Sequence, residues 1–399
     1  MNEEQWYITK RIWKARVQSI PFYLFRVLPI QKKKIVFCCI EGTTGYSCNP
    51  KYIAEELIRR KKKGNEKGYE LVWLVNDSSK RFPKEIKAVK NTLWNRAYHL
   101  STAKIWIDNS RKQLEVRKRK GQTYIQTWHA KLGFKPTCLD RGESFSKIAY
   151  LVSKHDSEMI DYVLSNSKWY DDTLPTGMIY YGPTLRFGSP RCDILVNRTN
   201  NLYKKVRQRY GLSEDVKFIM YAPTFRGGSQ KTDRTVTADE GKLDYDRLVC
   251  SLENRFGGKW YVLLRLHPQL VARQVQRDIQ NSRLIDTSKN DDMYEVLAGC
   301  DAFITDYSSA AFDAAVMRIP IFLYCYDYEE YQKERGSLLW KLEELPFLLA
   351  QDNDGLQHVI EAFDDTEYQR KLSKLFTDTQ MIEDGKASER MTDFISSIT

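Results

Sequence analysis

The sequence predicts an α/β protein built from two doubly wound parallel sheets, and three observations indicate this class. Short apolar strands alternate with helical patterns along most of the chain. Residues 300–324 contain a complete βαβ unit. A Gly- and Pro-rich connection at residues 182–193 separates the strands into two sets, so we place a domain boundary near residue 190.

The βαβ unit is the clearest local pattern in the chain. Ala302–Thr305 is a short apolar strand, Ala310–Arg318 has the composition of a helix, and Ile319–Tyr324 is a second buried strand. Ser308 or Ser309 can cap the helix, and a helix N-terminus with two hydroxyls at the end of a strand suits a phosphate. An ordinary capped helix explains the same residues, so both interpretations stay open here.

Length, charge and cysteine content limit the possible classes of protein. A chain of 399 residues with 42% hydrophobic residues has material for two to three folded domains. The net charge of +11 fits a basic surface, an anionic membrane, a polyanionic substrate or nucleic acid, although no nucleic-acid-binding motif is visible. The eight cysteines form no CxxC pair, which predicts reduced thiols. We expect neither a transmembrane helix nor a signal peptide.

Residues 1–34 have an unusual mixture of aromatic and basic residues. Large apolar side chains such as Trp6, Trp13 and Phe22 alternate with cations such as Lys10 and Arg16. This composition is typical of an amphipathic helix that lies in a membrane interface. A helix that packs on its own domain is the alternative, and two prolines interrupt the segment.

The first half of the chain gives strands and a Gly-containing loop. The loop 41–49 follows an apolar strand and precedes a helix that we expect from Pro50 to about Lys63. One strand ends on His129, and the carboxyl ends of parallel strands are where open α/β sheets bind ligands. The predicted strands are Ile35–Ile40, Tyr69–Val75, Lys104–Asp108, Tyr124–Trp128 and Tyr162–Leu164.

The second half repeats the pattern. Arg226 and His267 each follow a predicted strand, residues 228–243 form a polar loop, and residues 354–399 are helical. A lone histidine at a strand end is more often structural than catalytic. Arginine, histidine and a helix N-terminus at one sheet edge together favour a diphosphate. The predicted elements are strands Lys217–Ala222, Trp260–Leu266 and Leu284–Asp286, and helices Asp244–Phe256 and Asp292–Ala298.

Several stretches, in this order and spacing, resemble one family. The resemblance covers about residues 34–345 and points to the CDP-glycerol glycerophosphotransferases, the group of teichoic acid primases and polymerases. The stretches are Tyr124-Ile-Gln-Thr-Trp-His129, Gly188-Ser-Pro-Arg-Cys-Asp193, Tyr221-Ala-Pro-Thr-Phe-Arg226, Arg265-Leu-His267-Pro268 and Thr305-Asp306-Tyr-Ser308-Ser309 through Asp313.

The resemblance implies a GT-B-like fold, in which two Rossmann-like domains face each other across a cleft. Residues 35–190 would form the acceptor domain and 191–375 the CDP-donor domain, and a helix in 376–399 would cross back. The implied reaction transfers a polyol phosphate, first of all glycerol phosphate, from CDP-glycerol or CDP-ribitol to a hydroxyl of an undecaprenyl-linked acceptor and releases CMP. Residues 1–34 would hold the enzyme on the cytoplasmic face of the membrane as a peripheral protein.

The resemblance also implies roles for single residues. His129 would be the base on the acceptor hydroxyl, and His267 would lie at the donor diphosphate. No motif demands a metal, so we expect no required cofactor, and Mg²⁺ stays compatible with the pattern. The other implied contacts are Arg226, Thr224, Ser308 and Ser309 for the donor phosphates, Asp306, Asp313 and Pro268 for the nucleotide, and Gly42, Thr43, Gly45 and Lys135 for the acceptor.

One departure affects the acceptor. Polymerases of this family commonly have Gly after the first histidine, whereas Ala130 stands here, as in primase-like members. The acceptor, the polyol, the number of units added, the pathway (wall teichoic acid or capsule) and the oligomeric state are therefore left open. The alternatives are a GT-B glycosyltransferase that uses a nucleotide sugar, and a non-catalytic membrane- or polyanion-binding protein of the same fold.

Overall fold

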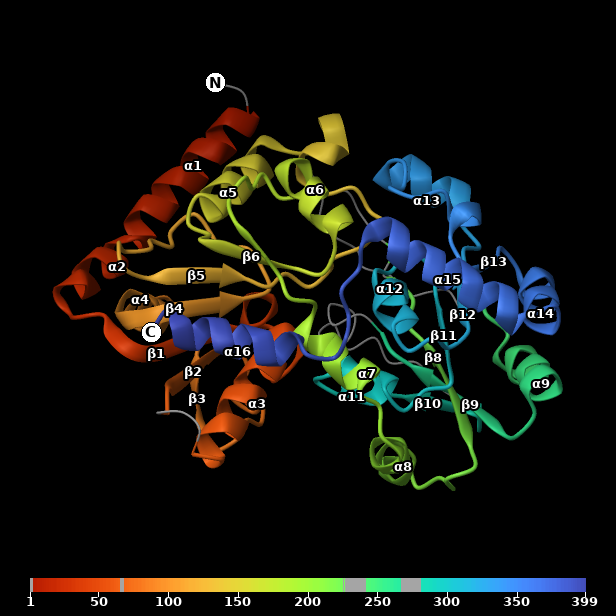
Figure 1. Cartoon of the computed structure of the whole chain (residues 1–399). Coiled ribbons are helices and arrows are strands. Elements are labelled where there is room, and N and C mark those ends of the chain that lie inside the picture. The colour runs from red at the N-terminus through yellow and green to blue at the C-terminus, as the bar shows by residue number, and fades with distance from the viewer. Residues whose placement is uncertain (1–2, 65–67, 225, 227–241, 267–280) are drawn as a thin grey trace. The chain divides into compact units, whose positions relative to one another are not determined.

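The computed structural model divides the chain into two compact α/β units. It describes residues 3–64, 68–224, 226, 242–266 and 281–399, without the side chains of residues 334 and 335 (Figure 1). Unit 1 comprises Met1–Lys131, Thr137–Asp193 and Ile382–Thr399, and unit 2 comprises Leu132–Pro136 and Ile194–Met381. The last residues of the chain thus belong to the same unit as the first.

Unit 1 is organised around a parallel seven-stranded sheet, as the alternating strands and helices predict (Figure 1). The strand order is β3-β2-β1-β4-β5-β6-β7, so the order reverses direction on either side of β1. The strands are β1 Gln31–Cys38, β2 Glu70–Val75, β3 Ile86–Lys90, β4 Ala103–Asp108, β5 Thr123–Gln126, β6 Tyr162–Ser165 and β7 Thr184–Arg186.

Helices cover both faces of this sheet. Several begin at side-chain caps, among them Thr92, Ser146 and Ser167, whose hydroxyls accept a backbone N–H of the first turn. The helical elements are α1 Glu3–Gln18, α2 Ile20–Leu24, η1 Phe25–Val27, η2 Ile40–Gly42, α3 Cys48–Lys62, α4 Leu93–Thr102, η3 Cys138–Ser144, α5 Lys147–Ser157, α6 Lys168–Gly177, η4 Pro190–Cys192 and α16 Ala387–Ser397.

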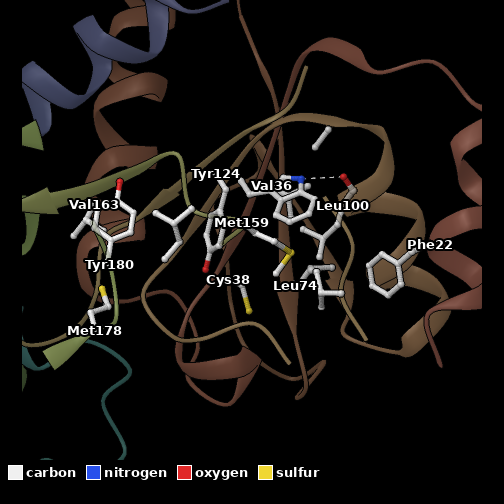
Figure 2. Close-up of a cluster of buried hydrophobic side chains, with 14 of the residues drawn as sticks. Phe22, Val36, Cys38, Leu74, Leu100, Tyr124, Met159, Val163, Met178 and Tyr180 are labelled. Carbon is white, nitrogen blue, oxygen red and sulfur yellow. Dashed lines mark hydrogen bonds between the residues drawn. The ribbon is translucent and has the colours of Figure 1, made fainter. Parts of the chain in front are cut away.

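Two hydrophobic clusters separate the layers of unit 1. On one face, Phe22 of α2 and Leu100 of α4 pack with alternate strand residues such as Val36 and Leu74 (Figure 2). On the other face, side chains of α3 and α16 meet the intervening strand residues, and Met391 of α16 is fully buried. The period-two alternation along each strand supplies both faces.

Unit 2 contains a second parallel sheet, with six strands in the order β10-β9-β8-β11-β12-β13. A core of buried side chains from α9 and α14 covers one face. The strands are β8 Lys217–Tyr221, β9 Trp260–Leu264, β10 Leu284–Asp286, β11 Ala302–Thr305, β12 Ile321–Tyr324 and β13 Leu348–Ala350. The helical elements are α7 Asp193–Val196, which starts at the last residue of unit 1, α8 Asn200–Arg209, α9 Tyr245–Phe256, α11 Met293–Leu297, α12 Ala310–Ala315, α13 Tyr328–Arg335, η5 Leu342–Glu344, α14 Asn353–Glu361 and α15 Asp365–Thr379.

Two predicted elements are shorter than expected for backbone reasons. The strand predicted to run to Trp128 ends at Gln126, because Trp128 adopts a positive φ of 49° that a strand does not allow. The helix predicted to run to Arg318 ends at Ala315, and Arg318 itself has φ 56°. Both departures place a polar or aromatic side chain just beyond the end of a regular element.

Two further features are the state of the cysteines and the length of the apolar helices. All eight cysteines are free thiols, and Cys250 is the exposed one among them. Within the described ranges, no helix is long and apolar enough to cross a membrane.

Candidate active site

His129 lies just beyond the carboxyl end of β5, and one hydrogen bond fixes its ring. Its Nδ1 is 2.8 Å from the carbonyl oxygen of Asn109, which follows β4. Because a carbonyl oxygen only accepts, Nδ1 carries the proton, and in the neutral ring Nε2 is left with a free lone pair. The backbone of the neighbouring strand therefore sets the tautomer that a general base needs.

The surroundings of His129 favour its neutral form. His129 is an exposed residue, and desolvation of its ring by the surrounding protein lowers its pKa below the ordinary value. The hydrogen bond to Asn109 raises the pKa, but the positive charges of Arg191, Arg111 and Lys131 lower it further. At neutral pH this ring is thus uncharged and able to take a proton.

Asn49, in the first turn of α3, holds the strained chain just before His129. Its Nδ2 donates to the carbonyl oxygens of Thr127 at 3.2 Å and Trp128 at 2.9 Å, while its Oδ1 accepts the N–H of Arg191 at 3.1 Å. The partners fix which end of the amide points where. Asn49 thereby ties the turn with positive φ at Trp128 to the Gly188–Asp193 stretch.

The Gly188–Asp193 stretch is a structural joint inside unit 1. Gly188 has φ 93°, and a Cβ there would lie 2.8 Å from the carbonyl oxygen of Ile382. The N–H of Ser189 donates to Oε2 of Glu383 at 3.0 Å. Asp193 accepts the N–H groups of the first residues of α16, Ala387 and Ser388, at 3.0 and 2.7 Å. These contacts show that the Gly188–Asp193 stretch holds the C-terminal segment in place.

The three acceptor residues predicted in the loop after β1 have different roles in the structure. Gly42 has φ 83°, and a Cβ there would lie 2.8 Å from Nδ2 of Asn91, so a side chain does not fit. Thr43 is exposed, whereas Gly45 is buried. Thr43 is therefore the one of the three with a side chain that a ligand can reach.

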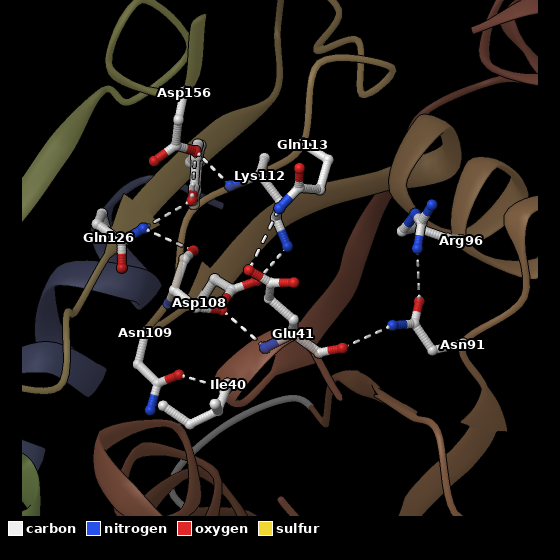
Figure 3. Close-up of polar contacts among 12 residues, drawn as sticks. Ile40, Glu41, Asn91, Arg96, Asp108, Asn109, Lys112, Gln113, Gln126 and Asp156 are labelled. Carbon is white, nitrogen blue, oxygen red and sulfur yellow. Dashed lines mark hydrogen bonds and ion pairs between the residues drawn. The ribbon is translucent and has the colours of Figure 1, made fainter. Parts of the chain in front are cut away.

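A buried polar network supports this edge of the sheet (Figure 3). The ammonium group of Lys112 forms an ion pair with Asp108, and the backbone N–H of Lys112 donates to Oδ1 of Asp156 at 2.9 Å. The same Oδ1 accepts the hydroxyl of Tyr124 at 3.1 Å, and that hydroxyl in turn accepts Nε2 of Gln126 at 2.8 Å. Burial raises the pKa of Asp156 to about 6. The network links the ends of β4 and β5, from which Asn109 and His129 follow.

The donor-phosphate residues of unit 2 gather around one arginine. The Arg226 guanidinium donates from Nη1 to Asp306 Oδ2 at 2.7 Å and from Nε and Nη2 to Asp327 at 2.5 and 3.0 Å. Nη1 also lies 2.8 Å from Oγ1 of Thr224, which itself donates to Asp306 at 2.8 Å. The aromatic ring of Tyr331 lies beside the guanidinium, with 5.3 Å between Arg226 Cζ and the ring centroid.

The carboxylates of Asp306 and Asp327 both form ion pairs with Arg226. Burial opposes the charged guanidinium, but the two carboxylates outweigh it and raise the pKa of Arg226 above its ordinary value. The backbone N–H of Tyr307 donates to the other oxygen of Asp306 at 2.6 Å. Asp306 is thus an internal support at the ends of β8 and β11, and its predicted contact with a nucleotide remains a prediction.

The helix start after β11 is present, in a smaller form than predicted. Ser309 is the cap residue of the six-residue α12 without a side-chain cap bond, and Oγ of Ser308 accepts the N–H of Ala310 at 3.3 Å. Both serines are partly exposed. Asp313 is buried in α12, where it accepts the hydroxyl of Tyr294 at 2.6 Å.

The segment after His129 belongs to unit 2, which the sequence did not predict. Phe134 packs on Phe312 of α12 with 5.0 Å between ring centroids. A Cβ at Gly133 would lie 3.6 Å from Cβ of Ser309. Lys135 places its ammonium group 5.6 Å from the ring centroid of Tyr331. Lys135 is therefore grouped with the predicted donor residues, and not with the loop of Gly42.

Some predictions fall outside these observations. His267 and Pro268 lie outside the residues that the structure describes. Among the residues that it does describe, no group of three or more His, Cys, Asp or Glu side chains is arranged to hold a metal ion. Asn49, Asn109 and Asp327 were not predicted as site residues. The polar Asn109 directly after a predicted strand was the available signal, whereas Asn49 and Asp327 gave none.

Comparisons with known proteins agree with this geometry. The teichoic acid poly(glycerol phosphate) polymerase of Staphylococcus epidermidis is 29% identical over 383 residues, which cover 92% of this chain and 51% of that protein. The chain thus spans about half the length of this relative. The teichoic acid ribitol-phosphate primase of Bacillus spizizenii is 30% identical over 319 residues, which cover 75% of this chain and 76% of that protein.

A solved structure and a family match complete the comparison. A histidine-to-asparagine variant of the wall teichoic acid polymerase TagF, soaked with CDPG, has a TM-score of 0.79 at 27% identity, covering 100% of this chain and 98% of that chain. This likeness confirms the GT-B-like class of two Rossmann-like α/β domains. The sequence pattern of one family matches residues 20–397. The chain therefore belongs to the CDP-glycerol:poly(glycerophosphate) glycerophosphotransferase family.

Proposed function

We propose that this protein transfers glycerol phosphate from CDP-glycerol to a hydroxyl of a lipid-linked acceptor in teichoic acid or related cell-surface polymer synthesis, with His129 as the general base. The observation that carries the proposal is the orientation of His129, whose Nδ1–H is held by Asn109 so that Nε2 can accept a proton. The family to which the chain belongs supplies the reaction class.

The reaction follows from this orientation. The acceptor O–H bond breaks and its proton passes to Nε2 of His129, while the acceptor oxygen forms a bond to the phosphorus that carries glycerol. The bond from that phosphorus to the bridging oxygen breaks, and CMP leaves with the oxygen and its electron pair. A phosphoryl transfer needs alignment and compensation of charge more than covalent catalysis. The lowered pKa of His129 keeps the base unprotonated at neutral pH.

On the donor side we propose that Thr224, Ser308 and Ser309 contact the phosphates. The partial exposure of the two serines, at the end of β11, supports this. Because Asp306 and Asp327 already compensate Arg226, a phosphate at this guanidinium has to share it with Asp327. His267, Pro268 and Asp313 keep their predicted roles at the diphosphate and the nucleotide. We propose that no metal cofactor is required.

We also propose that the N-terminal helices attach the enzyme to the cytoplasmic face of an anionic membrane, where an undecaprenyl-linked acceptor lies. Trp6 and Trp13 of α1 keep 55% and 60% of their surfaces exposed, and Val27 of η1 keeps 86%. Exposed aromatic residues beside cations are typical of interfacial helices. Phe22, by contrast, is fully buried in unit 1 and anchors the segment.

Vesicle sedimentation tests the membrane proposal. Removing residues 1–34 would also remove Phe22 from the core, so the informative variant is Trp6→Ser/Trp13→Ser, which changes exposed side chains alone. We expect wild-type protein to sediment with anionic vesicles and the variant to bind at least about 10-fold more weakly. Equal sedimentation of both proteins would contradict an interfacial α1.

CMP release tests the reaction. Purified protein is incubated with CDP-glycerol or CDP-ribitol, each with and without a lipid-linked acceptor analogue. We expect acceptor-dependent CMP release that falls by roughly 100-fold or more in His129→Ala. His155→Ala is the matched control, because Nε2 of His155 also bonds a backbone carbonyl, that of Val116 at 3.0 Å, away from the end of β5.

The outcomes separate the alternatives. CMP release from CDP-ribitol alone would show that the transferred polyol is ribitol instead of glycerol, with the same mechanism. The ribitol-phosphate primase among the relatives makes CDP-ribitol the relevant comparison. A product that gains sugar without phosphorus would indicate a nucleotide-sugar glycosyltransferase. No CMP from either donor, or a wild-type rate in His129→Ala, would refute the proposal.

A further inference from the structure

The side of helix α1 around its buried residue carries both apolar and cationic side chains: Ile8, Arg11 and Ile12 are partly buried, whereas Lys14 is exposed at its edge. Ala15 is buried in α1, and Arg11, Lys14 and Gln18 share its face at the spacing of helical neighbours. Trp13 and Val17 lie on the other side and each keep 60% of their surface exposed. Arg11 and Lys14 thus lie together on the side of α1 that is not occupied by Trp13 and Val17.

This inward face borders a pocket of about 380 Å³. The opposite wall consists of Glu41, in the turn after β1, and residues 113–115, which follow β4. The volume lies within the range of pockets that bind small ligands. β1 and β4 are neighbours in the parallel sheet, so the pocket lies at the carboxyl edge where such sheets bind ligands.

The pocket offers positive charge and hydroxyl-binding groups together. In the described part of the chain, no ion pair or hydrogen bond involves the side chain of Arg11 or Lys14. Glu115 is paired with Arg96 at 2.6 Å. Glu41 accepts Nε2 of Gln113 at 3.3 Å, and burial raises its pKa. An anion is thus attracted by the two cations, and hydroxyl groups find acceptors beside them.

The turn that carries Glu41 shares one support, Asn109, with the ring of His129, and Figure 3 shows the bond of Asn109 to this turn. Oγ of Ser110 accepts the N–H of Glu41 at 2.8 Å, and Oδ1 of Asn109 accepts the N–H of Ile40 at 2.7 Å. The carbonyl oxygen of Asn109 accepts Nδ1–H of His129 at 2.8 Å. The ring of His129 and the turn that carries Glu41 are therefore supported by the adjacent residues Asn109 and Ser110 at one edge of the sheet.

We propose that the pocket binds a phosphodiester unit of the acceptor chain, with the phosphate between Arg11 and Lys14 and the polyol hydroxyls at Glu41 and Gln113. This inference rests on the proposed function, in which the acceptor hydroxyl reaches His129. A polyol phosphate chain presents both groups in every repeat. An anionic lipid headgroup offers the same phosphate chemistry, but the shared frame of Asn109 and Ser110 favours the acceptor.

The test uses a soluble glycerol phosphate oligomer with a free terminal hydroxyl, in the absence of membranes. We compare Arg11→Ala/Lys14→Ala with the control Lys10→Ala/Arg16→Ala, which removes the same charge from α1. The control residues lie on outward rings, with Lys10 4.9 Å from the Trp6 centroid and Arg16 5.4 Å from that of Trp13. Acceptor Kd by calorimetry and acceptor KM by CMP release are measured for each protein, with thermal unfolding as the folding check.

We expect the pocket variant to raise acceptor Kd and KM by roughly 10-fold, with kcat and the KM for CDP-glycerol unchanged, and the control to stay within about 2-fold of wild type. The single variant Arg11→Lys, which keeps a cation at this position, should keep most of the wild-type affinity for the oligomer. Equal effects of both double variants, or none, would overturn the proposal. A pocket variant that loses binding to phosphatidylglycerol vesicles but not to the oligomer would also overturn it and assign the pocket to a headgroup.

The two proposals fail in different ways. If wild-type protein binds the oligomer through Arg11 and Lys14 but releases no CMP, the proposed function fails and the binding site stands. If CMP is released and oligomer binding ignores these cations, the site fails and the function stands.

Discussion

Asn49 is the residue whose loss should show whether the chain before His129 is held in place for catalysis. Asn49→Ala removes two donated hydrogen bonds, to Thr127 and Trp128, and one accepted from the N–H of Arg191. Asn49, Thr127 and Arg191 have less than 1% of their surface exposed, so water does not easily replace the lost partners.

The magnitude follows from these three bonds. A typical hydrogen bond contributes about 0.5–1.5 kcal/mol net, so the loss should lower the free energy of unfolding by about 2–4 kcal/mol. Trp128, at φ 49°, is then free to relax toward a negative φ. The left-handed conformation that it leaves costs about 1–2 kcal/mol more per residue than the right-handed one. A shift of about 1 Å in His129 can cost about 100-fold in rate, so we expect kcat to fall roughly 10- to 100-fold.

Urea unfolding and CMP release measure the two effects on the same variants. Asn49→Asp should be worse than Asn49→Ala, because a carboxylate would face the two carbonyl oxygens that the amide now donates to. Asn95→Ala is the control: Nδ2 of Asn95 makes a single exposed bond to the Lys90 carbonyl oxygen, so its loss should cost about 1 kcal/mol or less. Wild-type stability and rate in Asn49→Ala would refute the reasoning.

Three further outcomes are expected. The lowered pKa of His129 predicts that kcat/KM is flat at neutral pH and falls only as pH drops through a value below 6.5; a half-maximal rate above pH 7 would contradict this. Asp327→Ala should lower the free energy of unfolding by about 2–4 kcal/mol because it removes one carboxylate and two hydrogen bonds from the partly buried Arg226, whereas Asp354→Ala, which breaks an exposed pair, should cost about 1 kcal/mol or less; equal urea midpoints would contradict the difference. CMP release in EDTA should equal that in Mg²⁺, and loss of activity that Mg²⁺ restores would show that a metal is required.

Most of the strands that could be predicted lie inside the two sheets. β11 has the predicted bounds, because a continuous apolar run identifies a buried parallel strand. β10 also has the predicted bounds, although it is a partly exposed edge strand. β3, β7 and β13 were not predicted. β3 lies at an edge of the sheet, and Ile86 is the buried residue in it, so its sequence carries little hydrophobic signal. β7 and β13 are also edge strands, of three residues each.

The candidate site shows the same division between local and distant information. His129 could be found because it follows a strand, and the position after a parallel strand is local information. Its partner is a backbone carbonyl oxygen, which has no signature in the sequence, and Asn49 is 79 residues from Trp128 along the chain. Arg226 was predicted from its strand, but Asp327, 101 residues away, neutralises it. Contacts between residues so far apart along the chain depend on the topology of the sheet, which cannot be derived from one sequence.

The N-terminal segment illustrates a second limit. Trp13 and Phe22 are both large apolar residues in one basic segment, and composition treats them alike. In the structure Trp13 is mainly exposed, whereas Phe22 is fully buried against the sheet. The segment therefore packs on its own unit through Phe22 and presents the aromatic side chain of Trp13 outward, and its contact with a membrane stays a prediction.

The Gly188–Asp193 stretch connects the C-terminal segment of the chain to the turn before the histidine. The N–H of Arg191 reaches Asn49, which holds the turn before His129, and Asp193 caps α16. Helix α16 in turn buries Met391 and Ile395 in the core that α3, the helix of Asn49, also fills. A change in the C-terminal segment can therefore displace α3 and, through Asn49, the base itself. On this argument the stretch matters to the reaction by positioning, and its contribution should appear in kcat and in stability together rather than in substrate affinity.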